Sequence, residues 1–136
     1  MRLLLAEDER SLARALTVLL RKNNYEVDAV YDGEEAMAYL GSGNYDGAIL
    51  DIMMPKLDGF SACKEIKKEK DVPVIMMSAR GEEYDKLFGF ELGIDDYVVK
   101  PFSPKELMAR VKAVLNRHHA TAEQVSDQRL KFEGLE

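Results

Sequence analysis

The pattern that decides the fold first appears at residues 3–8, which read LLLAED. Four apolar residues in a row are typical of a strand buried on both faces, and here they end at two carboxylates, Glu7 and Asp8. Three later apolar runs also end at a polar residue: GAIL precedes Asp51, VIMM precedes Ser78 and YVV precedes Lys100. If the runs are parallel strands, these polar residues meet at the carboxyl edge of one sheet, where open α/β folds bind ligands.

Segments with helical spacing separate the apolar runs. The spacing predicts strands at residues 3–6, 27–30, 48–50, 72–77 and 97–99, and helices at about residues 9–22, 32–43, 60 to beyond 66, 82–92 and 103–115. The helix at 82–92 is the least regular, so it is a candidate for movement. Residues 103–106, SPKE, predict a capping box with proline at the first helical position. The strict alternation predicts a doubly wound, flavodoxin-like α/β fold with helices on both faces of one parallel sheet.

The composition is that of an ordinary globular protein of one domain. Its 136 residues can bury a core without disulfides, and its net charge of -6 argues against binding nucleic acid or an anionic membrane by itself. The single cysteine, Cys63, permits no internal disulfide, which suits the cytoplasm. The first apolar run is too short for an export signal, and no later run is long enough to span a bilayer.

The end of the chain differs in character. Residues 118–128 are polar without a clear period, as in a linker, and residues 129–133 alternate polar and apolar, as in a half-buried strand. Because a lone terminal strand has nothing of its own to pair with, we expect residues 129–136 to begin a second domain. A frayed tail is the alternative. His118 and His119 are expected to be solvated rather than metal ligands.

Each candidate site residue also has an ordinary structural interpretation. Glu7 and Asp8 could simply favour the positive end of a helix dipole. Asp51 could be a loop residue, Ser78 a helix N-cap, and Lys100 a surface lysine beside a proline. The functional interpretation is favoured because all of them occupy equivalent ends of successive strands.

The chemistry that fits these residue types is phosphoryl transfer to Asp51. A carboxylate oxygen can attack a phosphoryl group, but crowded carboxylates need a hard cation such as Mg²⁺ to offset their charge. We expect Asp8 and Asp51 to be direct ligands and Glu7 to act through a water. Lys100 would pair with one phosphoryl oxygen, and the Ser78 hydroxyl would donate to another.

With these motifs the chain resembles the receiver domain of two-component response regulators. The matching motifs are Glu7-Asp8, DIMMP at 51–55, Asp58-Gly59, Ser78-Ala79 and Lys100-Pro101-Phe102, and the receiver would occupy residues 1–117. The resemblance implies strand order 2-1-3-4-5, phosphate transfer to Asp51 from a histidine of a sensor kinase, and a Met53 backbone carbonyl in the magnesium shell. Many members carry aspartate in place of Glu7, which leaves open whether Glu7 contacts the ion directly or through water.

The same resemblance implies how the signal would leave the site. Tyr97 would be a rotamer switch that moves inward as Ser78 is drawn to the phosphate, and the Lys100–Pro101 bond would be cis. Kinase choice would depend on the first helix near Arg14, Val18 and Arg21.

Two longer stretches, FELGIDDY at 90–97 and KPFSPKEL at 100–107, resemble regulators with a C-terminal winged-helix DNA-binding domain. That subfamily forms homodimers when active, and the residues matching its charged contacts are Lys86 with Glu106, Glu91 with Lys112, and Asp96 with Arg110. A solvated charged face is the alternative. Residues 129–136 would then be the opening strand of the DNA-binding domain. A receiver that acts alone through protein contacts is the other possibility.

Three other classes fit less well. A phosphatase with an aspartyl nucleophile is expected to carry a second aspartate two positions on, where this chain has Met53. We therefore expect a phosphoacceptor domain rather than an enzyme acting on external substrates. A flavin carrier would need a phosphate-binding first loop, which Glu7 and Asp8 would repel. A dinucleotide enzyme would need a glycine fingerprint after the first strand, and the sequence has none.

Overall fold

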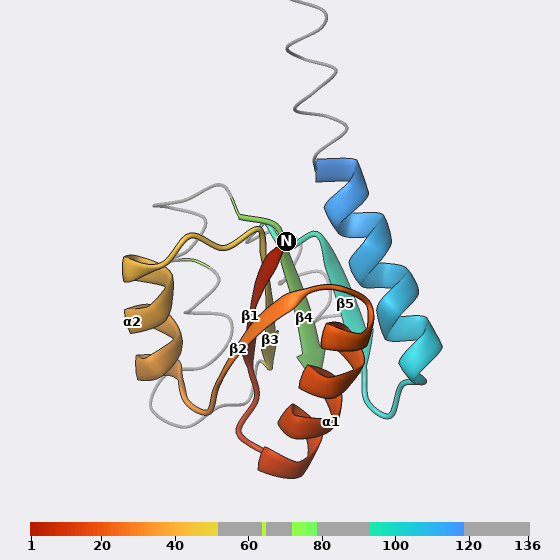
Figure 1. Ribbon diagram of the computed structural model, residues 1–136, viewed down its shortest axis with the longest axis horizontal. Helices are drawn as coiled ribbons and strands as arrows, with labels where there is room; N and C mark the ends of the chain where they lie inside the picture. The colour runs from red at the N-terminus through yellow and green to blue at the C-terminus, as the bar shows by residue number, and fades with distance from the viewer. Residues whose placement is uncertain (52–63, 65–71, 79–92, 119–136) are drawn as a thin grey trace, which may run out of the picture.

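The computed structural model describes residues 1–51, 64, 72–78 and 93–118. Its strands are β1 (Arg2–Ala6), β2 (Glu26–Val30), β3 (Gly47–Asp51), β4 (Val74–Ser78) and β5 (Asp96–Val99), and its labelled helices are α1 (Arg10–Lys22) and α2 (Gly33–Ser42). A further helix occupies residues 104–118 (Figure 1). The predicted helices near 60–66 and at 82–92, and the predicted strand at 129–133, lie outside the described residues. So does almost all of the predicted linker.

All neighbouring strands pair in parallel, in the order β2-β1-β3-β4-β5. The predicted fold and strand order are therefore confirmed, and each predicted strand lies within two residues of the observed one. Parallel pairing brings the last residues of β1, β3 and β4 to the same edge of the sheet. No helix in the described ranges has the length and apolar character needed to cross a bilayer.

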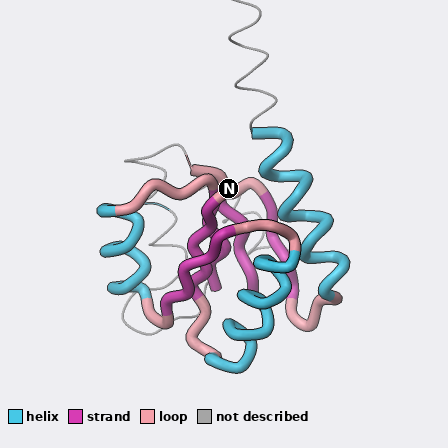
Figure 2. The backbone as a smooth tube through the Cα atoms, viewed as in Figure 1, coloured by secondary structure: helices cyan, strands magenta, loops and turns pink. Residues whose placement is uncertain are grey.

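The sheet separates two apolar cores, and this explains the continuous run LLLA in β1. Leu3 and Leu5 face α1 and the helix at 104–118, whereas Leu4 and Ala6 face α2. All four are at most 1% exposed. Figures 1 and 2 show this layering, with α2 on one side of the sheet and the other two helices on the opposite side. A strand covered on both faces has no place for alternating polar residues.

Side-chain caps set where two helices begin. Asp32 precedes α2 and accepts a hydrogen bond from the Glu35 backbone N–H at 2.8 Å. Ser103 does the same for the helix at 104–118, accepting from the Glu106 N–H at 3.0 Å. The Glu106 carboxylate, however, accepts from Arg110 Nε at 3.3 Å. The serine half of the predicted capping box is thus confirmed, while the glutamate pairs with an arginine one turn later in the helix.

Candidate functional site

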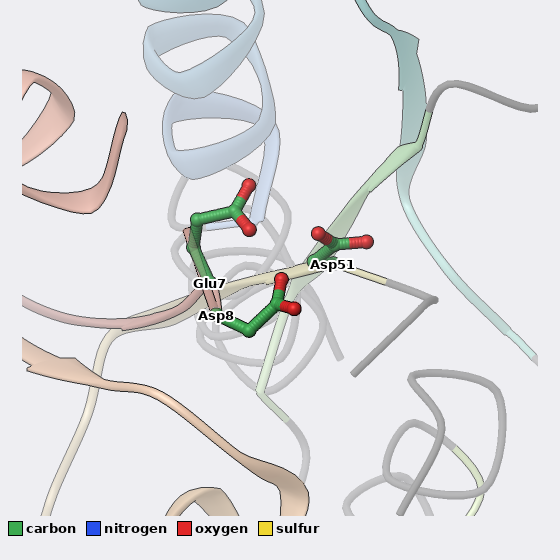
Figure 3. Close-up of side chains that lie close together, drawn as sticks. All are labelled: Glu7, Asp8 and Asp51. Carbon is green, nitrogen blue, oxygen red and sulfur yellow. The ribbon is translucent and has the colours of Figure 1, made fainter. Parts of the chain in front are cut away.

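Three carboxylates gather at the carboxyl ends of β1 and β3. Glu7 and Asp8 directly follow β1, and Asp51 is the last residue of β3 (Figure 3). Each offers one oxygen, and these oxygens all lie within 4.8 Å of one another. Glu7 is 0% exposed and Asp51 is 4% exposed, whereas Asp8 lies at the surface. The sheet topology therefore brings these three predicted site residues together.

Lys100 supplies positive charge to this cluster. It follows β5, yet its Nζ donates to Asp51 Oδ2 at 3.0 Å, reaching past the intervening strand β4. The same ammonium is hydrogen-bonded to Glu7 Oε1. The backbone of Lys100 is also fixed, because its N–H donates a hydrogen bond to the Ser78 carbonyl at 2.7 Å. The predicted cis bond between Lys100 and Pro101 is confirmed.

Burial and charge shift the pKa values of this group of side chains. Burial removes solvent from the Glu7 carboxyl group and is the main reason why its pKa is raised to about 7. The neighbouring Asp51 carboxylate also raises this pKa, whereas the hydrogen bond from Lys100 lowers it. For Lys100, burial favours the neutral amine, but the contacts with Glu7 and Asp51 outweigh it and leave its pKa raised. Two buried carboxylates thus share one ammonium, so a further cation at this edge would be stabilised.

Ser78 lies on β4, the strand next to β3, which carries Asp51, and Tyr97 lies on β5, one strand further. Ser78 ends β4 and is 1% exposed, and Tyr97 lies within β5 and is 5% exposed. The tyrosine belongs to the apolar core on the α2 side of the sheet, which includes Val74 and Met76 of β4. Both side chains are therefore buried, Ser78 at the carboxyl end of its strand and Tyr97 in the apolar core. Whether they move together stays a prediction.

The predicted dimer contacts are only partly within the described residues. Arg110 Nη1 donates to both carboxylate oxygens of Asp96, at 2.9 and 3.0 Å, and this pair forms inside one chain. Glu106 shares the same arginine, and Lys112 is exposed on the same helix. Met53, Lys86 and Glu91 lie outside the described part of the chain.

Sequence reasoning missed two arrangements. The first is the direct pairing of Glu7 with Lys100, because an acidic residue beside a magnesium site was expected to contact only the ion or its water. The second is a network in which Asp28 accepts from Tyr45 Oη at 2.6 Å and from Arg2 Nη2 at 2.7 Å. The signal for the second was available: an aspartate inside an otherwise apolar strand needs polar partners.

The comparisons with known proteins place these residues in a family context. The family described as "Response regulator receiver domain" matches residues 3–112. Among curated proteins, the chain is 50% identical over 121 residues to the "Probable transcriptional regulator ycf27" of Guillardia theta, covering 89% of this chain and 48% of that protein. It is 45% identical over 121 residues to the "Transcriptional regulatory protein ResD" of Bacillus subtilis, covering 89% of this chain and 50% of that protein. The chain thus spans about half the length of these curated relatives.

A solved structure supports the same relationship. The response regulator protein TrrA from Thermotoga maritima, determined in complex with Mg²⁺-BeF, is 38% identical to this chain, with a TM-score of 0.75. The match covers 83% of this chain and 97% of that one.

Proposed function

Because this chain belongs to the response regulator receiver domain family, we propose that it is a signalling domain switched by phosphorylation of Asp51 by a sensor histidine kinase. The observation that carries this proposal is the contact of Lys100 Nζ with Asp51 Oδ2 at 3.0 Å, beside two further carboxylates. A lysine held at an aspartate is suited to bind the phosphoryl oxygens that arrive there.

The transfer step forms one bond and breaks another. A carboxylate oxygen of Asp51 attacks phosphorus, the bond from phosphorus to the kinase imidazole nitrogen breaks, and its electron pair returns to the imidazole. Lys100 pairs with one oxygen of the transferred group, and the Ser78 hydroxyl donates to another. These groups stabilise charge and take no part in proton transfer. Tyr97 then follows Ser78 inward and carries the change to the surface of the domain.

The donor set fits Mg²⁺, which prefers carboxylate and carbonyl oxygen ligands and often keeps several waters. One oxygen each of Glu7, Asp8 and Asp51 lies within 4.8 Å of the other two, so one cation could be shared among them. Asp8, Asp51 and the Met53 backbone carbonyl would hold the ion, and Glu7, which is paired with Lys100, would act through a water. When bound, the ion offsets the charge of the carboxylates and of the phosphoryl group. The Mg²⁺-BeF complex of the related TrrA protein supports this assignment.

The output we propose is transcriptional. Both curated relatives are named as transcriptional regulators and are about twice as long as the match. Residues 118–128 would link the receiver to a cytoplasmic winged-helix DNA-binding domain that begins at residues 129–136. Phosphorylation would promote a homodimer through the pairs Lys86–Glu106, Glu91–Lys112 and Asp96–Arg110. A receiver that acts only through protein contacts is the second candidate.

Phosphorylation of the isolated chain tests the central step. Incubation with Mg²⁺ and acetyl phosphate should add one phosphoryl group, measured by intact mass spectrometry. Asp51→Asn should abolish the added mass, whereas the exposed control Glu26→Gln should leave it unchanged. Full labelling of Asp51→Asn would contradict the assignment.

A further inference from the structure

Outside the acidic edge, the most unusual surface is the open edge of the sheet at β2. Among the strands that the structure describes, β2 has β1 as its one neighbour, and it lies between α1 on one face of the sheet and α2 on the other (Figure 1). An edge strand presents backbone N–H and C=O groups that can pair with another chain. A partner bound at this edge would lie at the opposite edge of the sheet from β5 and its ion pairs.

The backbone pairing identifies which residues face outward. The Glu26 N–H donates to the Met1 carbonyl and the Val30 carbonyl accepts from the Glu7 N–H, so these two β2 residues face β1. In a parallel strand, successive residues present their backbone groups to opposite sides. Val27 and Ala29 therefore present theirs to the open edge.

Arg21 supports this assignment and partly protects the edge. Its Nη2 reaches from the end of α1 and donates to the Val27 carbonyl at 3.3 Å. This contact satisfies one outward carbonyl with a side chain that can rotate away. Ala29, next along the edge, is only partly covered.

A continuous groove follows this edge. One hollow of about 420 Å³ is lined by α1, β2 and Tyr39 of α2, and a second of about 550 Å³ continues from it towards the amino end of β2. The two hollows share Arg21, Val27 and Asp28. A strand of five residues is about 16 Å long, so the groove suits an extended segment better than a compact ligand.

The groove is positively charged and has apolar contacts on both walls. Four arginines line it, at positions 2, 10, 14 and 21, and among the described residues its acidic lining is limited to Glu26 and Asp28. Asp28 is already bonded to Arg2 and Tyr45. Val18 on α1 and Tyr39 on α2 are 49% and 44% exposed, so each offers apolar contact area along the groove.

From these features we propose that the β2 edge is a docking surface for an acidic, extended segment of a partner protein, which adds to the sheet beside β2. Its backbone would pair with Val27 and Ala29, and its acidic side chains would lie along Arg10 and Arg14. Arg21 would leave the Val27 carbonyl and bind a carboxylate of the segment. A second copy of this chain is a poorer occupant, because pairing two β2 edges would bring arginines against arginines.

The test is a titration of the complete 136-residue chain with a short synthetic peptide in which glutamate alternates with threonine, followed by NMR. The expected result is a change in the amide signals of Val27 and Ala29, slower hydrogen exchange at Ala29, and weaker binding at high salt. Two control peptides should fail to bind: one with lysine in place of glutamate, and one with an N-methylated backbone that cannot pair with a strand.

Matched variants test the role of charge. Arg14→Glu should weaken binding of the acidic peptide by about fivefold, whereas Arg117→Glu, the same change on another exposed helix position, should not. Three results would overturn the proposal: no change at Val27 and Ala29, equal binding of the N-methylated peptide, or concentration-dependent changes at these amides without any peptide. The last would identify a second copy as the occupant. None of these outcomes depends on phosphorylation of Asp51.

Discussion

Lys100 Nζ lies 3.0 Å from Asp51 Oδ2, although β4 separates the strands that carry the two residues. The contact is possible because parallel strands end at one edge, and because the long lysine side chain can cross the end of a single strand. The same ammonium pairs with the fully buried Glu7. Any group that binds Asp51 must therefore redistribute a charge network that already links β1, β3 and β5.

Lys100→Ala should slow phosphorylation of Asp51 by about 100-fold, since it removes one positively charged donor from the transferred group. The final stoichiometry with acetyl phosphate and Mg²⁺ should still reach one. Phosphate-dependent dimerisation, followed by analytical ultracentrifugation, should be lost. Lys22→Ala, at an exposed position at the end of α1, is the control. Unchanged dimerisation of phosphorylated Lys100→Ala would refute a signalling role for this lysine.

Mg²⁺ should stabilise the folded domain through the carboxylate cluster. At a free Mg²⁺ concentration 100 times its Kd, the free energy of unfolding should rise by about 2.7 kcal/mol, because the ion binds only the folded state. Asp8→Asn should remove most of this increase, as measured by chemical denaturation with Mg²⁺ and with EDTA. Glu26→Gln should retain it. An equal increase in Asp8→Asn would exclude Asp8 as a ligand.

Arg110→Ala should weaken the phosphorylated dimer without changing the affinity for Mg²⁺. In one chain, Arg110 is bonded to both oxygens of Asp96, so the substitution also leaves that carboxylate without its cation. The pair is partly exposed, and its loss should lower the free energy of unfolding by less than about 1 kcal/mol. Arg117→Ala is the control. If both variants dimerise like the original chain, Arg110 belongs to a solvated charged face.

The Asp28 network should make a pH-dependent contribution to stability. Hydrogen bonding from Tyr45, together with the Arg2 guanidinium, holds the pKa of Asp28 below its ordinary value of 3.8. A carboxylate with a lowered folded pKa stabilises the protein above the unfolded pKa, and this contribution is lost as pH falls through the folded pKa. The difference in unfolding free energy between the original chain and Asp28→Asn should therefore be largest near neutral pH and shrink below about pH 4. A difference that stays constant down to acid unfolding would contradict this account.

The order of strands and helices was predictable because it depends on local patterns. LLLA in β1 indicated a strand buried on both faces, and the structure places its alternate residues in two different cores. Ser103 caps its helix at the position where SPKE predicted a cap, and Asp32 caps the helix that was predicted to begin there. Such features depend on side chains a few residues apart, so the sequence carries them directly.

The partners of individual charged residues were less predictable. Asp96 and Arg110 were expected to meet between two chains, yet within one chain they already form a bidentate pair. Glu7 was assigned to a metal site, directly or through a water, and its contact with Lys100, 93 positions away, came only from the structure. A charged side chain has several possible partners in a sequence, and long-range geometry selects among them.

By itself the sequence determined the alternation of strands and helices and the residue types at each strand end, because hydrophobic periodicity and backbone preferences act locally. It also placed Glu7, Asp8 and Asp51 at one edge, since parallel strands allow no other arrangement of their carboxyl ends. Only the tertiary structure decided that Lys100 joins Asp51 and Glu7, and that Arg21 covers the carbonyl of an open edge strand. Those contacts depend on distances between elements, which the packing of the sheet and helices sets and no local pattern encodes.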